Sequence, residues 1–165
     1  MKHLIFITFI LTSFSSFACK CKATKTIKEE YKSVDFVLVG KILSIDTISV
    51  LDSNLIASPT YNRIVHELPR QSIQVVHYKL ELTKTYKGVI TKKLINIYSA
   101  PSDETCGFIF TVGNSYIVYG SKNTTMYFDD IGNYTPPNGE NIVWVTRCGR
   151  TKLSNQEEIK VLDSI

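Results

Sequence analysis

The sequence lacks most of the patterns from which an enzymatic function is usually predicted. Its 165 residues contain no H-E-x-x-H motif and no nucleophile elbow. His66 and His77 are isolated, with no Asp or Glu at metal-ligand spacing, so they do not predict a metal site. The lysines are scattered rather than gathered into a basic block, which argues against a nucleic-acid partner. We therefore expect neither an enzyme nor a cofactor of the chain's own.

Long apolar runs are also absent beyond the N-terminus. Met1-Lys2-His3 is a short basic start, residues 4–11 are almost entirely apolar, and residues 13–18 are mostly small or polar and end in Ala. This run is shorter than the roughly 20 residues that a membrane-spanning helix needs. The pattern predicts a secretory signal at 1–18 and one domain at 19–165, secreted, extracellular or periplasmic, with no transmembrane segment. The alternative is a lipoprotein signal, with Cys19 lipid-linked in the outer membrane.

Cysteine is scarce, and all four cysteines lie in the predicted mature chain, at positions 19, 21, 106 and 148. An exported chain meets an oxidising compartment, in which thiols pair. Four cysteines allow three connectivities, and direct Cys19–Cys21 pairing would close a strained ring. The patterns that tie both N-terminal cysteines to distant ones are therefore favoured. Lipidation of Cys19 would leave three cysteines, which cannot all pair.

The rest of the chain has the alternation of β-strands, and Gly40 predicts a bulge or bend in the first of them. Capping boxes starting at Thr26 and Ser154 predict one short helix before the strands and one after them. We expect long loops at 46–72 and 122–141, although residues 47–51 could instead extend the first strand. The prediction is a mainly β fold, a five-stranded OB-fold-like Greek-key barrel. The expected strands are 36–45, 73–86, 94–98, 116–120 and 142–146.

Four short segments carry a resemblance to a known family. They are Cys19-x-Cys21, the Y-x₇-Y-K-G pattern at 78–88, the sequence S-D-E-T-C-G-F at 102–108, and V-T-R-C at 145–148. In this order they resemble the inhibitory domain of the tissue inhibitors of metalloproteinases. The similarity covers most of residues 19–162. Netrin-type modules of other secreted proteins share this barrel, so the resemblance bears on fold more directly than on activity.

The resemblance implies two disulfides, Cys19–Cys106 and Cys21–Cys148. It also implies that the α-amino nitrogen and carbonyl oxygen of Cys19 bind the catalytic zinc of a target metalloprotease and displace its water. A catalytic zinc keeps an open position for such a chelate, and the target's zinc is the only metal expected. The partner would be a zinc metalloprotease. The implied inhibitory wedge consists of Cys19, Lys20, Cys21, Ser102, Asp103, Glu104, Thr105 and Cys106.

The chain departs from this family in two respects. Lys20 stands where the family usually has a small or hydroxylated residue, and an ammonium group in an apolar pocket costs several kcal/mol unless a carboxylate meets it. Either the target has an acidic or open pocket, or the chain does not inhibit typical matrix proteases. The cysteines for a third disulfide and for a second domain are missing, as in bacterial members of the group. We expect a monomeric metalloendopeptidase inhibitor; the alternative is a non-inhibitory netrin-like binding module of the cell envelope, lipid-anchored at Cys19.

Overall fold

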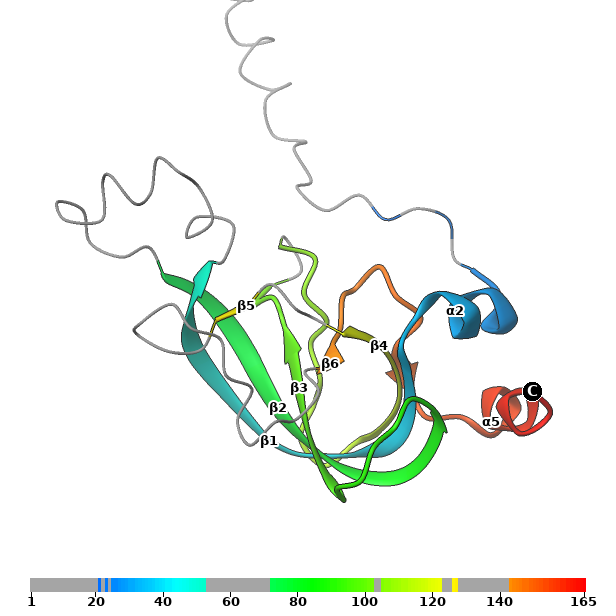
Figure 1. Cartoon of the computed structure of the whole chain (residues 1–165). Coiled ribbons are helices and arrows are strands. Elements are labelled where there is room, and N and C mark those ends of the chain that lie inside the picture. Colours follow the sequence, from blue (N-terminus) through cyan, green and yellow to red (C-terminus); the bar gives the residue numbers. More distant parts are fainter. Residues whose placement is uncertain are drawn as a thin grey trace, which may run out of the picture.

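A computed structural model describes residues 21, 23, 25–52, 72–102, 105–122, 126–127 and 143–165. The predicted signal at 1–18 lies outside these residues, as do most of the predicted loops 46–72 and 122–141. Figure 1 shows a curved sheet with both helices at one end of it. The elements in chain order are α2 (Ile27–Ser33), β1 (Phe36–Asp52), β2 (Ser72–Lys87), β3 (Leu94–Ser99), β4 (Ser115–Lys122), β5 (Met126–Tyr127), β6 (Val143–Trp144), β7 (Lys152–Leu153) and α5 (Gln156–Asp163).

The strands form one mainly antiparallel sheet. Strand β1 pairs with β2 along most of its length, and its first part, from Phe36 to Lys41, also pairs with β4. Strand β2 pairs with β3, β3 runs parallel to β6, and β6 is antiparallel to β4. The pairings therefore lead from β1 through β2, β3, β6 and β4 back to β1. The predictions of a mainly β chain and of two short helices are confirmed.

Strand β1 is long, and its pairing with β2 is irregular. The β1–β2 register shifts three times, once between Val39 and Gly40, so the irregularity predicted at this glycine is present. A Cβ at Gly40 would overlap the carbonyl oxygen of Glu81 on β2 and the Leu80 side chain. Only glycine allows the two strands to approach so closely here.

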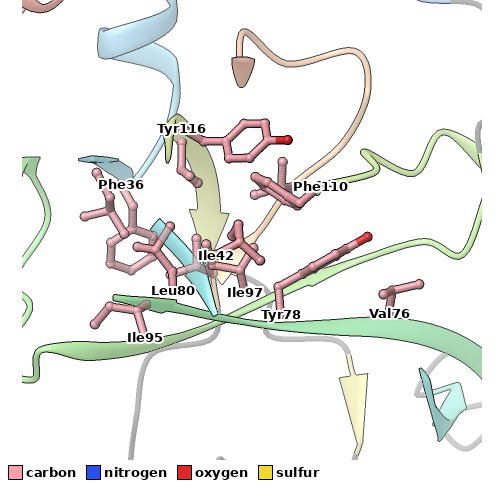
Figure 2. Close-up of a cluster of buried hydrophobic side chains, with 13 residues drawn as sticks. Phe36, Ile42, Val76, Tyr78, Leu80, Ile95, Ile97, Phe110 and Tyr116 are labelled. Carbon is pink, nitrogen blue, oxygen red and sulfur yellow. The ribbon is translucent and has the colours of Figure 1, made fainter. Parts of the chain in front are cut away.

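The main core lies on the inner face of the sheet. Alternation along β2 places Val76, Tyr78 and Leu80 on this face, as the period-two pattern predicts. Figure 2 shows these side chains pointing toward Phe110 and Tyr116. The core cluster consists of Phe36, Leu38, Ile42, Val76, Tyr78, Leu80, Ile95, Ile97, Phe110, Tyr116, Val118, Val143 and Val145.

The two helices cover a smaller apolar cluster built around Val37, Ile117 and Leu162. Helix α2 begins as predicted, with the Thr26 side chain accepting from the Glu29 N–H and the Glu29 side chain accepting from the Thr26 N–H. The cap predicted for α5 was wrong by one residue. Its N-cap is Asn155 rather than Ser154, because the Asn155 side chain accepts the N–H of Glu158 at 2.8 Å.

Strands β1, β5, β6 and β7 differ from the prediction. Strand β1 continues to Asp52, so residues 46–52 are not part of a loop; the backbone of Asp46 and Thr47 pairs with β2 although both residues are exposed. Strand β5 lies within the predicted loop 122–141 and pairs with the end of β1. Strand β6 has two residues rather than five, and β7 was not predicted. Such short strands depend on tertiary contacts and have no local sequence signal.

Candidate functional site

The candidate site begins where strand β3 ends in a tight corner. The backbone N–H groups of Gly107 and Thr105 both donate to the carbonyl oxygen of Ser102, at 2.8 Å and 3.2 Å. The Thr105 hydroxyl donates to the same oxygen at 2.9 Å and accepts the Ser102 N–H at 3.2 Å. Ser102 and Thr105, which the resemblance places in the wedge, therefore bind each other and close the corner.

Cys106 and Gly107 adopt the conformations that this corner requires. Cys106 has a φ of +62°, in the left-handed region that residues with a side chain seldom adopt. Gly107 lies against the backbone of the preceding turn, so a Cβ there would overlap the Ala100 carbonyl oxygen and lie 2.8 Å from that of Ser102. The glycine of the C-G pair thus has a steric reason in this structure.

A second segment, after β6, joins the corner. The N–H of Arg147 donates to the carbonyl oxygen of Cys106 at 2.9 Å, and Gly107 forms a β-bridge with Thr146. The next residue, Cys148, forms a disulfide with Cys21, with the two Cα atoms 5.0 Å apart. Three segments are therefore joined here: the corner, the Cys148 segment and the beginning of the described chain. We call them together the shared edge.

Ser99 connects these two segments from inside the protein. Its fully buried hydroxyl accepts the N–H of Phe108 at 2.7 Å and donates to the carbonyl oxygen of Val145 at 2.8 Å. Sequence analysis did not single out this residue. The available signal was a serine at the end of an apolar strand, directly before Ala100-Pro101. A buried hydroxyl in that position needs partners, so it is expected to hold the turn that follows.

The structure brings together four of the eight predicted wedge residues. Ser102, Thr105 and Cys106 form the corner, and Cys21 is attached beside it through Cys148. The other four lie outside the described residues. The Cys21–Cys148 pairing is the one that the resemblance implies. No described cysteine has a free thiol, including Cys106, and the Cys19–Cys106 pairing stays a prediction. The wedge residues outside the described chain are Cys19, Lys20, Asp103 and Glu104.

A buried carboxylate binds Arg150, two residues after Cys148. Glu158 of α5 is 2% exposed and accepts Nε of Arg150 at 2.8 Å, Nη2 of Arg150 at 3.0 Å and the hydroxyl of Tyr119 at 2.7 Å. Lys152 forms an ion pair with the same carboxylate at 2.6 Å. The third guanidinium nitrogen, Nη1 of Arg150, donates to the carbonyl oxygen of Lys25 at 2.9 Å.

These contacts determine the charge of the network. Burial alone would raise the pKa of the Glu158 carboxyl, but hydrogen bonds from Arg150, Lys152 and Tyr119 outweigh burial and hold this pKa below its usual value. Burial, followed by the hydrogen bond to Glu158, raises the pKa of the Tyr119 hydroxyl. Glu158 is therefore ionised and Tyr119 neutral at physiological pH. The network was not predicted from the sequence, because Tyr119 is 39 positions from Glu158 and because only the fold turns Arg150 and Lys152 toward helix α5.

Comparison with known proteins adds no relative. No protein-family model and no curated protein matches this sequence. Within the described residues, no cluster of three or more His, Cys, Asp or Glu side chains could hold a metal ion. None of the described helices has the length and apolar character needed to cross a membrane.

Proposed function

We propose that the chain is a secreted inhibitor of zinc metalloproteases. In this proposal residues 1–18 are removed on export, and the α-amino nitrogen and carbonyl oxygen of the new N-terminal Cys19 coordinate the zinc of the target. The inhibitor itself has no cofactor and acts as a monomer, outside the cell or in the periplasm. The proposal extends the resemblance in the sequence, and its support from the fold is the shared edge.

One observation carries the proposal. The Arg147–Cys106 hydrogen bond and the Cys21–Cys148 disulfide hold the start of the described chain against the corner of residues 102 and 105–107. Cys19 is two residues before Cys21 in the sequence, and the proposal is that this short spacing holds its chelating groups beside the corner. A chelating group attached to a rigid edge loses little conformational freedom on binding, which favours affinity.

The strand pairings support the finer architecture that the inhibitor requires. We propose that the strands form a five-stranded OB-fold-like Greek-key barrel; the support is a sheet whose pairings return to β1, with β3 and β6 parallel. In this assignment β1, β2, β3, β4 and β6 form the barrel, while β5 and β7 are additions to it. Strand β1 would take part in both halves, since it pairs with β2 and with β4.

The chemistry of Lys20 defines the target. Its side chain would enter the specificity pocket of the protease, where an ammonium group needs a carboxylate or water to replace its hydration. We therefore propose that the inhibited proteases have an acidic or open pocket at this position. The variant Lys20→Thr is expected to shift inhibition toward proteases with apolar pockets.

The test compares two N-termini. The exported protein, starting at Cys19, and a variant with one additional Ala before Cys19 are assayed against a panel of zinc metalloproteases. The additional residue removes the α-amino group from the chelate but leaves the disulfides and the fold in place. We expect inhibition by the natural terminus and a loss of at least about a hundredfold with the extension, since a zinc ligand is removed.

Intact mass before and after reduction provides the control. A chain that starts at an unmodified Cys19 and contains two disulfides is expected. A lipid-modified Cys19 would contradict the inhibitor mechanism and favour the envelope-binding module instead. Equal inhibition by both N-termini would also overturn the zinc-chelating mechanism, because it would show that the α-amino group is not used.

A further inference from the structure

The segment of residues 148–150 holds the chain ahead of helix α2 at two points. Cys148 forms the disulfide with Cys21, and Arg150 donates from Nη1 to the Lys25 carbonyl oxygen at 2.9 Å. We call Cys21, Ala23 and Lys25 the N-terminal arm; all three residues are exposed. In Figure 1 this arm leads into α2, with the segment after β6 nearby. The disulfide alone would leave the arm free to rotate about one point. With a second attachment at Lys25, the orientation of the arm relative to residues 148–150 is fixed.

Arg150 is suited to this role because its guanidinium group is itself held in place. Nε and Nη2 face the two oxygens of Glu158 at 2.8 Å and 3.0 Å. The planar group can form this two-pronged contact in one orientation only, and that orientation directs Nη1 toward Lys25. The Glu158 carboxylate is fixed in turn by Tyr119 and Lys152. The direction of the arm therefore depends on a carboxylate in α5.

The hydrogen bond from Arg150 to Lys25 lies at the point where the arm joins helix α2. Lys25 directly precedes Thr26, the N-cap of α2, whose ψ of 163° marks the point where the chain leaves the helix. The Lys25 side chain turns back to the helix, with Nζ 2.8 Å from the Ser33 hydroxyl and 3.3 Å from a Glu30 carboxylate oxygen. Both the backbone and the side chain of Lys25 are thus held.

We infer that Arg150, oriented by Glu158, is a positioning residue that fixes the direction of the N-terminal arm and so presents the inhibitory terminus. The inference rests on the proposed function for its purpose, but the clamp on the arm can be measured without a protease target. Its physical effect is preorganisation, since an arm that is already ordered loses less entropy when the terminus binds.

The test uses a matched pair of variants, Arg150→Lys and Lys152→Arg. Each variant exchanges one cationic side chain that binds Glu158 for the other type, Arg for Lys or Lys for Arg, and leaves the net charge unchanged. Only Arg150→Lys removes the guanidinium group that binds both Glu158 and the Lys25 carbonyl oxygen. The readout is the rate at which trypsin cleaves the Lys25–Thr26 bond, whose carbonyl oxygen is the one that Arg150 binds. We expect Arg150→Lys to speed this cleavage about tenfold, the effect of losing one charged hydrogen bond, and Lys152→Arg to leave it unchanged.

Global unfolding is measured on the same variants to separate local from general destabilisation. Faster cleavage at Lys25 in Arg150→Lys alone, at unfolding midpoints similar to those of Lys152→Arg, supports the clamp. Equal cleavage rates in the two variants and the unaltered chain would overturn it. If Arg150→Lys folds poorly, Tyr119→Phe, which loosens Glu158 without removing a cation, replaces it and is expected to speed cleavage by a smaller factor.

The purpose of the clamp is tested with a protease that the unaltered chain inhibits. We expect Arg150→Lys to raise the dissociation rate about tenfold and to change the association rate little, because most changes at an interface act on dissociation. An unchanged dissociation rate would overturn the positioning role. If the unaltered chain inhibits no protease while the clamp is found by cleavage, the proposed function fails and the clamp on the arm stands.

Discussion

The backbone N–H of Arg147 donates to the carbonyl oxygen of Cys106, at an N···O distance of 2.9 Å. This bond joins two cysteine-bearing segments that are about forty residues apart in the sequence. Because Cys148 follows Arg147, the bond also fixes where the disulfide to Cys21 meets the corner. Three further features hold the candidate site: the close fit at Gly107, the buried hydroxyl of Ser99 and the Cys21–Cys148 disulfide. Each of them can be altered separately.

The steric fit is tested by Gly107→Ala. A Cβ at this position would overlap the Ala100 carbonyl oxygen, which belongs to backbone and cannot turn away. We expect a loss of about 3 kcal/mol in the free energy of unfolding, measured by urea denaturation, as is usual for overpacking. The corner would also have to open, so inhibition should weaken together with stability.

Gly113→Ala is the matched control for that substitution. Gly113 has a φ of +88°, but a methyl group added there would meet no atom within 4 Å, so only backbone strain opposes the change. We expect a cost of about 1 kcal/mol. A larger loss for Gly113→Ala than for Gly107→Ala would show that the close approach at the corner is not the dominant constraint.

The buried hydroxyl is tested by Ser99→Ala. The substitution leaves the Phe108 N–H and the Val145 carbonyl oxygen without their common partner in a buried position. We expect a loss of about 2 kcal/mol, since a buried polar group without a partner is costly. Ser115→Ala changes an exposed serine and should lower the unfolding midpoint little; equal effects of the two substitutions would contradict the assignment to Ser99.

Much of the sheet could be predicted because its periodicity is local. The alternation that places Val76, Tyr78 and Leu80 in the core is visible in the sequence, and so is the effect of Gly40 on β1. The Thr26 capping box involves residues three positions apart and was also found. In each case the physical signal lies within a few residues of the feature that it predicts.

The features that were missed depend on distant partners. The sequence pattern left open whether residues 47–51 extend the first strand or begin a loop; they form a strand because β2 supplies backbone partners, a cause that lies outside their own sequence. Nothing in the sequence around Glu158 indicates that it is buried, because Tyr119 is distant in the chain and the contact with Arg150, eight residues away, forms only in the fold. At the candidate site, the resemblance indicated Cys21, Ser102 and Cys106, but Ser99 and Arg150 act through contacts that only the fold reveals.

The covalent link is tested by the double variant Cys21→Ser with Cys148→Ser. The disulfide joins residues separated by 127 positions, so its loss releases a long loop in the unfolded chain. The chain-entropy relation gives a cost of about 5 kcal/mol for a loop of this length. Thermal unfolding without reductant should show a much lower midpoint; a midpoint within a few degrees of the unaltered protein would contradict this expectation.

The last prediction concerns acid pH and the Glu158 network. The pKa of Glu158 in the folded protein lies below its usual value of 4.5, because the hydrogen bonds from Arg150, Lys152 and Tyr119 outweigh the effect of burial. A carboxyl group with a lowered folded pKa adds stability above its unfolded pKa. This stability is lost as the pH falls through the folded pKa. The unaltered protein is therefore expected to lose stability as the pH is lowered from about 4.5.

Glu158→Gln should remove this contribution. At pH 7 the variant is expected to be less stable by about 3 kcal/mol, because Arg150 loses its buried partner. Below pH 4.5 its stability should fall less steeply than that of the unaltered chain. Asp163→Asn serves as the control, since hydrogen bonds from Lys84 and Tyr86 also lower the pKa of the exposed Asp163. It should flatten the acid slope only slightly and cost little at pH 7, because the Lys84 and Asp163 side chains are about half exposed and water screens their attraction. Identical pH profiles for Glu158→Gln and the unaltered chain would refute the assigned charge of Glu158.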